Sequence, residues 1–175
     1  TKFRKDDERV LATGTTMPKM VEMFLNRYGL PDWFMTHKMP VHDSEGQIIG
    51  IMGTVERYNQ EKALKSADPE IARAVEKLLS HPENFSSVTE LAKEAGMSRR
   101  HFNRRFKDET SLTPIQFLGR CRIQLACQLL RSERGKTISD IALEIGFCDQ
   151  SAFTTQFRER MGTTPFKYRQ AYEPN

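Results

Sequence analysis

The segment from Ser98 to Lys107 reads Ser-Arg-Arg-His-Phe-Asn-Arg-Arg-Phe-Lys and combines an apolar stripe with a run of cations. Phe102 and Phe106 are four residues apart, so they would share one face of a helix. Ser98 is a good N-cap, and Gly96 just before it allows a turn. The cations would then face outward: Arg99, Arg100, Arg104, Arg105 and Lys107. This pattern favours a helix laid on DNA, although the segment by itself also fits an amphipathic helix with a solvated cationic face.

A second copy of this pattern follows later in the chain. At an offset of 50, Val88, Leu91, Ala92, Ala95, Gly96 and Met97 match Ile138, Ile141, Ala142, Ile145, Gly146 and Phe147. At an offset of 51, Phe102, Phe106, Thr113 and Pro114 match Phe153, Phe157, Thr164 and Pro165. The extra residue falls in the second turn, near Cys148 and Asp149. Because apolar positions, turn glycine and Thr-Pro stop recur in one order, the sequence predicts two copies of one helix-turn-helix unit.

Capping signals divide the second part of the chain into helices. Four signals open helices: Asp68 with Pro69, the box from Ser87 to Glu90, Thr113 with Pro114, and the box from Thr137 to Asp140. His81-Pro82 stops the first helix, and the long helix from Thr113 is expected to run to about Arg131. The sequence therefore predicts helix-turn-helix units at about 87–108 and 137–160, joined by one long helix.

The first 67 residues follow a different pattern. In residues 33–41, one face carries Trp33, Met35, Met39 and Val41, while Thr36 and Lys38 lie on the other. Residues 48–55, which are rich in β-branched side chains, follow the turn residues 43–46. This arrangement predicts an antiparallel hairpin with a four-residue loop. Residues 19–28 fit a helix or a strand equally well. His37 shares the strand face of Trp33, where it could line a pocket or ligate a haem, or have a structural role.

Composition narrows the possible classes of function. The 175 residues carry a net charge of +4 and a pI near 9.0, which weakly favours an anionic partner. The three cysteines form no Cys-x-x-Cys pair, so we expect reduced, mostly buried thiols and no metal site. With no membrane-length apolar run and no signal-peptide pattern, we expect a cytoplasmic protein. Phosphate-loop, nucleophile-elbow and zinc-protease motifs do not occur, so we expect no catalytic residues and no enzyme.

The helical part closely resembles the DNA-binding domain of AraC-type (arabinose-regulator-like) transcription factors. The likeness is carried by Leu91-Ala92, Gly96-Met97-Ser98, Phe102, Phe106, Thr113-Pro114, residues 122–130, residues 138–142, Gly146-Phe147, Phe153, Phe157, residues 162–165 and Tyr168-Arg169. The resemblance implies a mainly α domain of seven helices over residues 68–172 that reads promoters as an activator or a repressor. The implied partners are double-stranded DNA and, for an activator, RNA polymerase.

The N-terminal part resembles the C-terminal half of a PAS domain, a sensory α+β module with a five-stranded antiparallel sheet. The likeness lies in residues 8–14, Glu22, residues 33–43, Gly46 and residues 48–51. It makes residues 19–28, 33–41 and 48–55 the last three strands of a small antiparallel segment spanning 1–58, followed by a helical linker at 59–67. It also implies a possible homodimer through this part.

Two departures from the PAS pattern matter. The N-terminal half of the module is absent, and Glu56-Arg57-Tyr58 stands where Asp-Ile-Thr is often found. We therefore expect a truncated sensor or one whose missing half was removed, and the absence of an initiating Met agrees with this. No cofactor is expected from these residues, although a complete PAS-like domain could hold a small-molecule ligand.

Helical position sorts the candidate DNA contacts into two groups. The base-contact candidates are Arg100, Asn103 and Arg104 in the first unit and Gln150, Ser151, Thr154 and Thr155 in the second. The phosphate-contact candidates are Arg99, Arg105, Lys107, Thr113, Arg158 and Thr164. Arginine can donate a bidentate pair to guanine and asparagine can read adenine, whereas phosphate contacts position the protein without reading sequence.

The second unit is expected to contribute the weaker contact, because Thr155 stands where the family often has a basic residue. The function predicted is a sequence-specific DNA-binding regulator controlled by a PAS-like sensory part. The alternative is a signalling module that binds another protein and does not bind DNA specifically.

Overall fold

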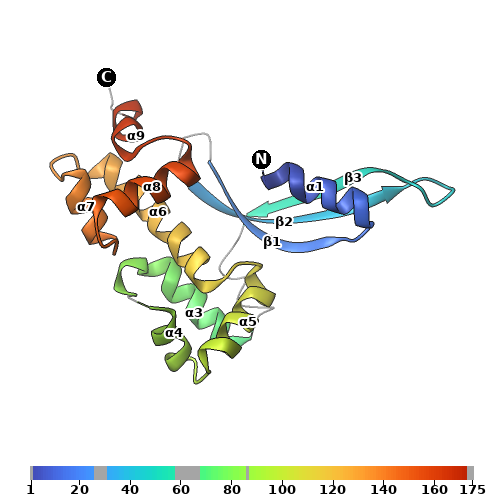
Figure 1. Cartoon of the computed structure of the whole chain (residues 1–175), viewed down its shortest axis with the longest axis horizontal. Helices are drawn as coiled ribbons and strands as arrows, with labels where there is room; N and C mark the ends of the chain where they lie inside the picture. The colour runs from blue at the N-terminus through green and yellow to red at the C-terminus, as the bar shows by residue number, and fades with distance from the viewer. Residues whose placement is uncertain (1, 26–30, 58–67, 86, 173–175) are drawn as a thin grey trace.

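The computed structural model describes residues 2–25, 31–57, 68–85 and 87–172. An N-terminal helix and a three-stranded sheet precede a helical domain (Figure 1). One end of the sheet lies against the helices, and the hairpin at the other end extends away from them (Figure 1). The linker predicted at 59–67 lies outside the described residues, so the predicted division into 1–58, 59–67 and 68–172 stays a prediction.

Strands β1 (Met17–Leu25), β2 (Pro31–His42) and β3 (Ile48–Arg57) form an antiparallel sheet in the order β1-β2-β3. β1 resolves the helix-or-strand ambiguity of residues 19–28 in favour of a strand as far as Leu25; residues 26–28 lie outside the described residues. β1 pairs with β2 from Leu25 opposite Pro31 to Met17 opposite Lys38. This pairing selects the strand, because it satisfies the backbone N–H and C=O groups of the segment, whose partners cannot be read from the periodicity of its side chains.

The predicted hairpin between β2 and β3 is confirmed, but its loop has a different length. The loop comprises residues 43–47 rather than four residues, because the register shifts by one residue beside His42. The Asp43 amide donates to the Gln47 carbonyl at 3.0 Å, and the Asp43 carboxylate accepts from the amides of Glu45 and Gln47. The carboxylate thus organises the wider loop.

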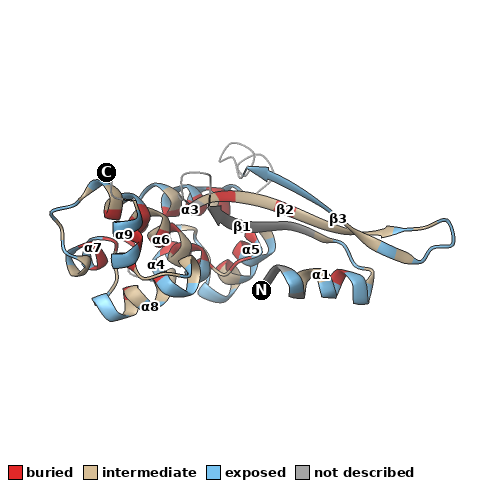
Figure 2. Cartoon of the chain, turned by 90° about the horizontal axis from the view of Figure 1, so that it is seen from above, coloured by how far each residue is buried: buried red, intermediate tan, exposed pale blue. Residues whose placement is uncertain are grey.

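Helix α1 (Lys2–Thr13) packs against β2 and β3. Val10 is fully buried, and Lys38 Nζ of β2 lies 2.7 Å from Asp7 Oδ1 of α1, with the lysine side chain only 12% exposed. This helix had no counterpart among the elements expected from the sequence. It covers part of the sheet near the protruding hairpin, while the buried residues of the molecule concentrate in the helical domain (Figure 2).

Seven α-helices occupy the described residues between 68 and 172, as the resemblance implied. They are α3 (Pro69–Ser80), α4 (Val88–Glu94), α5 (Arg99–Thr110), α6 (Pro114–Ser132), α7 (Ile138–Glu144), α8 (Gln150–Met161) and α9 (Pro165–Ala171), with a 3-10 turn η1 (Pro82–Asn84) after α3. Each begins at a side chain that accepts a hydrogen bond from an amide two or three residues on: Asp68, Ser87, Ser98, Thr113, Thr137, Asp149 and Thr164. These caps satisfy amides that lack partners within their helices, and five of them, at Asp68, Ser87, Ser98, Thr113 and Thr137, are the starting points predicted from the sequence.

The long helix α6 contributes to two hydrophobic cores. Its first half supplies Phe117, Leu118 and Cys121 to the core of the first helix-turn-helix unit. Its second half supplies Ile123, Ala126, Cys127 and Leu130 to the core of the second. Each unit therefore packs around its own stretch of one shared helix.

Trp33 of β2 joins the sheet to the helical domain, a contact that the sequence did not predict. It is 7% exposed and lies in the core of the first helix-turn-helix unit. Its ring stacks on Phe117 of α6 at 4.9 Å between centroids, and its Nε1 donates to Gln124 Oε1. β1 also lies against α5. The end of the sheet is thus part of the helical core.

Candidate nucleic-acid interface

The first recognition helix, α5, is anchored by two aromatic side chains. Phe102 and Phe106 are fully buried, with centroids 5.6 Å apart, and Phe106 meets Phe117 edge-on at 5.4 Å. Ser98 accepts from the His101 amide at 3.3 Å and fixes the start of the helix. Because one face is buried, the opposite face is directed to solvent, as the spacing of the phenylalanines predicted.

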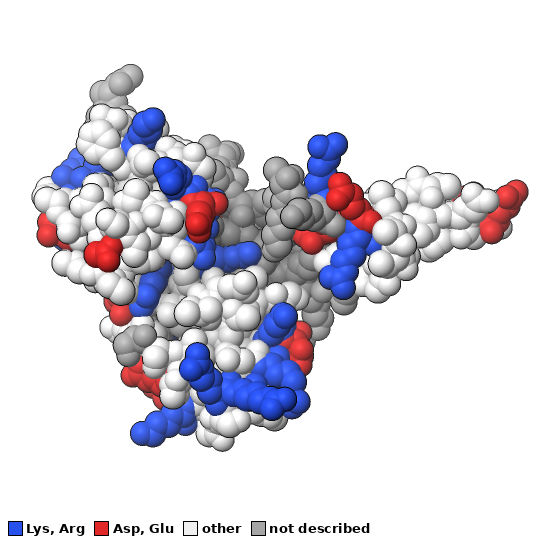
Figure 3. Space-filling model, in the orientation of Figure 1, with Lys and Arg blue, Asp and Glu red and all other residues white. Residues whose placement is uncertain are grey.

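The cations of α5 lie on that outer face. Exposed residues are Arg99, Arg100, Arg104, Arg105 and Lys107, and Asn103 is half-buried. In the space-filling view, Lys and Arg side chains gather over α5 (Figure 3). Arg104 Nη2 lies 3.4 Å from His101 Nδ1 one turn earlier. The predicted base-contact and phosphate-contact residues of this helix therefore form one cationic surface, and their individual roles stay predictions.

Arg105 has a partner that the sequence did not indicate. Its guanidinium forms an ion pair with Asp68, whose side chain is only 7% exposed and also caps α3 through the Glu70 amide at 2.9 Å. Arg105 thus links α5 to the start of α3, and one edge of its side chain is occupied. A phosphate contact from Arg105 would use its remaining donors.

The second recognition helix, α8, has the same frame and a different surface. Asp149 accepts from the Ala152 amide at 2.7 Å, and Phe153 and Phe157 are fully buried with centroids 5.5 Å apart. Its predicted contact residues are exposed in the case of Gln150, Ser151, Thr155 and Arg158, and half-buried in the case of Thr154. α8 therefore presents amide and hydroxyl groups where α5 presents guanidinium groups.

Arg160 differs from its neighbour Arg158. Its Nη1 donates to the Gln156 carbonyl at 3.4 Å and to the Gln156 side chain, and a Cβ at Gly119 of α6 would lie 3.0 Å from its Nη2. Burial lowers the pKa of Arg160. This side chain packs α8 onto α6, whereas Arg158 remains exposed.

At the two helix starts that read Thr-Pro, side chains of the same turn already accept hydrogen bonds from backbone amides. Thr113 and Thr164 accept from the amides of Gln116 and Lys167, each at 3.3 Å, and the Gln116 side chain accepts from the Thr113 amide at 3.0 Å. A phosphate contact predicted at these positions would therefore have to come from other first-turn amides.

The turns between the paired helices are built alike. Gly96 and Gly146 both have positive φ, +64° and +89°. In each turn the glycine amide bonds to the carbonyl three residues back at 3.0 Å, and the next amide bonds to the carbonyl five residues back at 2.9 Å. The inserted residue lies after the glycine, where Asp149 replaces Ser98 as the cap. The predicted duplication is confirmed at the level of backbone hydrogen bonds.

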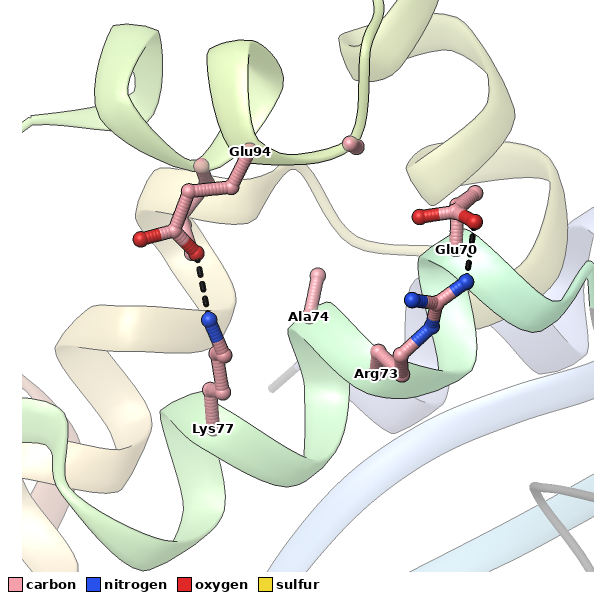
Figure 4. Close-up of a pocket in the computed structure, with 7 residues that line it drawn as sticks. Glu70, Arg73, Ala74, Lys77 and Glu94 are labelled. Carbon is pink, nitrogen blue, oxygen red and sulfur yellow. Dashed lines mark hydrogen bonds and ion pairs between the residues drawn. The ribbon is translucent and has the colours of Figure 1, made fainter.

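A small hollow lies between α3 and α4, on the first unit (Figure 4). Ala74 and Leu91 lie among its lining residues, and Lys77 Nζ of α3 reaches Glu94 Oε2 of α4 at 2.7 Å across it. Arg73 pairs with Glu70 along α3. Both ion pairs are drawn in Figure 4, and the one between Lys77 and Glu94 fastens α3 to the helix-turn-helix unit.

The cysteines are free and two of the three are buried, which confirms the expectation of reduced, mostly buried thiols. Cys121 and Cys127 are buried, but Cys148 is exposed, because it occupies the lengthened second turn. Burial raises the pKa of the Cys127 thiol to about 12. Within the residues that the structure describes, no group of three or more His, Cys, Asp or Glu could hold a metal ion. No helix in this described part is long and apolar enough to span a bilayer.

Comparisons with known proteins agree with this geometry. A family model described as "Helix-turn-helix domain" matches residues 91–171. A putative AraC-like transcription regulator of Streptomyces lividans is 36% identical over 103 residues, 59% of this chain and 34% of that protein. The RCS-specific HTH-type transcriptional activator RclR of Escherichia coli is 30% identical over 124 residues, 70% of this chain and 43% of that protein.

A solved structure extends the likeness to a protein bound to DNA. The crystal structure of the DNA-binding domain of the global transcriptional factor AdpA, in complex with a target DNA, matches with a TM-score of 0.56 and 35% identity. The match covers 59% of this chain and 92% of that one. The chain spans less than half the length of the two curated relatives above. With two like helix-turn-helix units on one long helix and relatives of this kind, the helical part of the chain belongs to the AraC-type helix-turn-helix DNA-binding domains.

Proposed function

We propose that this chain binds duplex DNA sequence-specifically, with α5 and α8 in successive segments of the major groove. The observation that carries the proposal is that α5 and α8 are built alike. Each is capped at its start, is anchored by two buried phenylalanines and presents its polar face to solvent, and both units pack on the shared helix α6. Two such helices suit segments about one helical turn of DNA apart, roughly 34 Å.

The two helices have unequal tasks in this proposal. Arg100 and Arg104 of α5 read guanine, and Asn103 reads adenine. Gln150, Ser151, Thr154 and Thr155 of α8 make hydroxyl- and amide-mediated base contacts. Arg99, Lys107 and Arg158, with the remaining donors of Arg105 and the amides near Thr113 and Thr164, contact phosphates. The charge on α5 supports its larger share of the affinity.

A salt titration tests the proposal against a protein-binding signalling module. A duplex selected from a random pool and a scrambled duplex of equal length are titrated at about 50 and 200 mM salt. For about six phosphate contacts, affinity should fall roughly 10³-fold between these salts. A specific duplex that binds no better than the scrambled one, with little salt dependence, would support the signalling module instead.

We propose further that the PAS-like sheet controls this binding. Support comes from Trp33, which joins the sheet to the core that also holds Phe106 of α5. Phe117 contacts both rings, at 4.9 Å and 5.4 Å. A change in the sheet therefore has a packed route to the cationic helix.

The sheet also supports a proposed homodimer. β3 is an edge strand whose Ile49 and Val55 are 65% and 61% exposed, an arrangement that suits pairing with a second copy. Sedimentation of the parent and of an Ile49→Glu, Val55→Glu variant tests it, because the charged variant should be monomeric.

For an activator we propose RNA polymerase as the further partner, tested by transcription from a promoter carrying the selected duplex.

A further inference from the structure

Arg122 lies where the two cores of α6 meet. Cys121 before it belongs to the first core, and Ile123 after it belongs to the second. Arg122 itself is half-buried, and burial lowers its pKa. Its side chain is therefore not part of the cationic surface of α5, and its role follows from its contacts within the protein.

On one side the guanidinium binds the first unit. Arg122 Nε donates to the Pro82 carbonyl at 3.3 Å, and Nη2 donates to the Phe85 carbonyl at 2.5 Å. Pro82 and Phe85 are themselves buried, at the two ends of the η1 segment that leads from α3 into α4. The contact fixes this segment of the first unit to the middle of α6.

On the other side the same guanidinium packs on the second unit. A Cβ added at Gly146 would lie 2.6 Å from Arg122 Nη2 and 2.8 Å from its Cζ, so the arginine lies directly on the turn between α7 and α8. Arg122 Cζ is 5.9 Å from the centre of the Phe147 ring. Phe147 in turn contacts Phe153 of α8, at 5.4 Å between centroids. One side chain thus contacts both units, including the turn that precedes the second recognition helix.

We propose that Arg122 is a positioning residue that sets the orientation of the two helix-turn-helix units, and thereby the spacing between DNA segments that the protein accepts. This inference rests on the proposed reading of DNA by both α5 and α8. The planar guanidinium can donate within its plane to two carbonyls while its face packs on a ring, which a lysine ammonium cannot do. Without it, the units remain attached to α6 through separate cores but lose the side chain that bridges them.

A distance measurement tests the positioning role without DNA. Spin labels are placed on α5 and α8 through Asp108→Cys and Glu159→Cys in a Cys148→Ser background, since Asp108, Glu159 and Cys148 are exposed. We expect the distance distribution between the labels to widen or shift in Arg122→Met and in Arg122→Lys. Arg134→Met, which removes an exposed arginine, is the matched control and should leave it unchanged. Circular dichroism confirms that each variant is folded, and an unchanged distribution in folded Arg122→Met overturns the proposal.

A binding measurement tests the consequence for DNA. The selected duplex is compared with duplexes in which one base pair is inserted or removed between the two segments, and with a duplex that keeps only the α5 segment. The parent should discriminate against the altered spacings by roughly tenfold or more, and Arg122→Met should reduce this ratio at least about fivefold while binding the single segment as the parent does. Equal losses on all duplexes would overturn the proposal. A parent without any sequence preference would instead overturn the proposed function, and the spin-label comparison would then decide the positioning role alone.

Discussion

The arginines of this protein do different work according to how far each is buried. Arg100 and Arg104 are exposed on α5 and available to a ligand. Arg122 and Arg160 are half-buried, and each packs against a glycine of another segment, Gly146 and Gly119 respectively. A Cβ at either glycine would crowd a guanidinium, which shows that these two arginines pack closely against neighbouring segments and stabilise the fold. Counting cations from the sequence does not separate the two groups.

The duplicated turns provide a matched test of the Arg122 contact. Gly96→Ala and Gly146→Ala both place a side chain at positive φ, but nothing lies within 4 Å of the Gly96 position, whereas Arg122 lies 2.6 Å from that of Gly146. We expect Gly96→Ala to lower the free energy of unfolding by about 1–2 kcal/mol. Gly146→Ala should cost about 1–3 kcal/mol more, because the guanidinium must leave the Pro82 and Phe85 carbonyls. Urea unfolding measures both.

A double variant shows whether that extra cost belongs to Arg122. In an Arg122→Met background the added methyl group meets a flexible, uncharged side chain, so the difference between the two alanine variants should shrink. An unchanged difference would assign the extra cost to backbone strain at φ +89°.

The three thiols should differ sharply in reactivity. Cys148 is exposed, whereas burial raises the pKa of Cys127 to about 12 and that of Cys121 still further. In native protein at about pH 8 we expect a thiol reagent to label Cys148 quickly, and all three cysteines only in denaturant. Rapid labelling of a second cysteine in the native state would contradict the burial of these side chains. Mass spectrometry of the labelled peptides assigns each site.

The same buried thiols predict how stability depends on pH. In the unfolded chain they ionise near the ordinary pKa of 9.0, but in the folded chain Cys127 ionises only near 12. Between these two pKa values the unfolded chain loses thiol protons that the folded chain keeps. These thiols should therefore leave the free energy of unfolding unchanged below about pH 9 and lower it above that pH. Chemical unfolding at several pH values measures the slope. Cys127→Ala should make that slope shallower.

At the scale of elements, local signals predicted the helical domain and long-range contacts produced the differences. Capping residues such as Ser98 and Thr137 act on amides three residues away, so their effect can be read from the sequence. The strand β1 was ambiguous because its pattern fits two periods until β2 pairs with it. Trp33 bonds to Gln124, 91 positions away, and Arg122 bonds to Phe85 and Pro82, 37 and 40 positions away. No local pattern marks such partners.

The cationic helix α5 allows a direct separation of reading from positioning. Arg104→Ala should cost about 1–3 kcal/mol at one base pair and relax the preference there. Arg105→Ala should weaken binding to all sequences alike, because this residue combines a proposed phosphate contact with the ion pair to Asp68. Selection of bound sequences from a random pool, repeated for each variant, measures both effects. Equal losses on specific and scrambled DNA for both variants would contradict the assignment of Arg104 to a base.

Asp68→Asn is the control for the structural part of the Arg105 effect. It weakens the ion pair and keeps an acceptor for the cap of α3. If Asp68→Asn weakens DNA binding as much as Arg105→Ala does, then Arg105 acts by fixing α5 to α3. If it does not, the arginine itself contacts the DNA.

At the scale of the whole molecule, the sheet and the helical domain share a core. The rings of Trp33, Phe117, Phe106 and Phe102 follow one another at centroid distances of 4.9, 5.4 and 5.6 Å, from β2 through α6 to the recognition helix. The second core has no residue of the sheet among its buried members in the described chain. A perturbation of the sheet should therefore affect α5 more than α8.

Trp33 is the single tryptophan of the sequence, so its fluorescence reports directly on this junction. If binding at α5 and docking of the sheet are coupled, a specific duplex must change the environment of Trp33, because coupling between two sites acts in both directions. We expect acrylamide quenching of Trp33 to change when the selected duplex binds and to stay constant with a scrambled duplex. Phe117→Leu, which removes the ring between Trp33 and Phe106 but keeps an apolar side chain, should reduce the change while the duplex still binds. Quenching that is identical in the free and specifically bound protein would show that the sheet is a passive attachment, since the packed rings would then carry no free energy between the two parts.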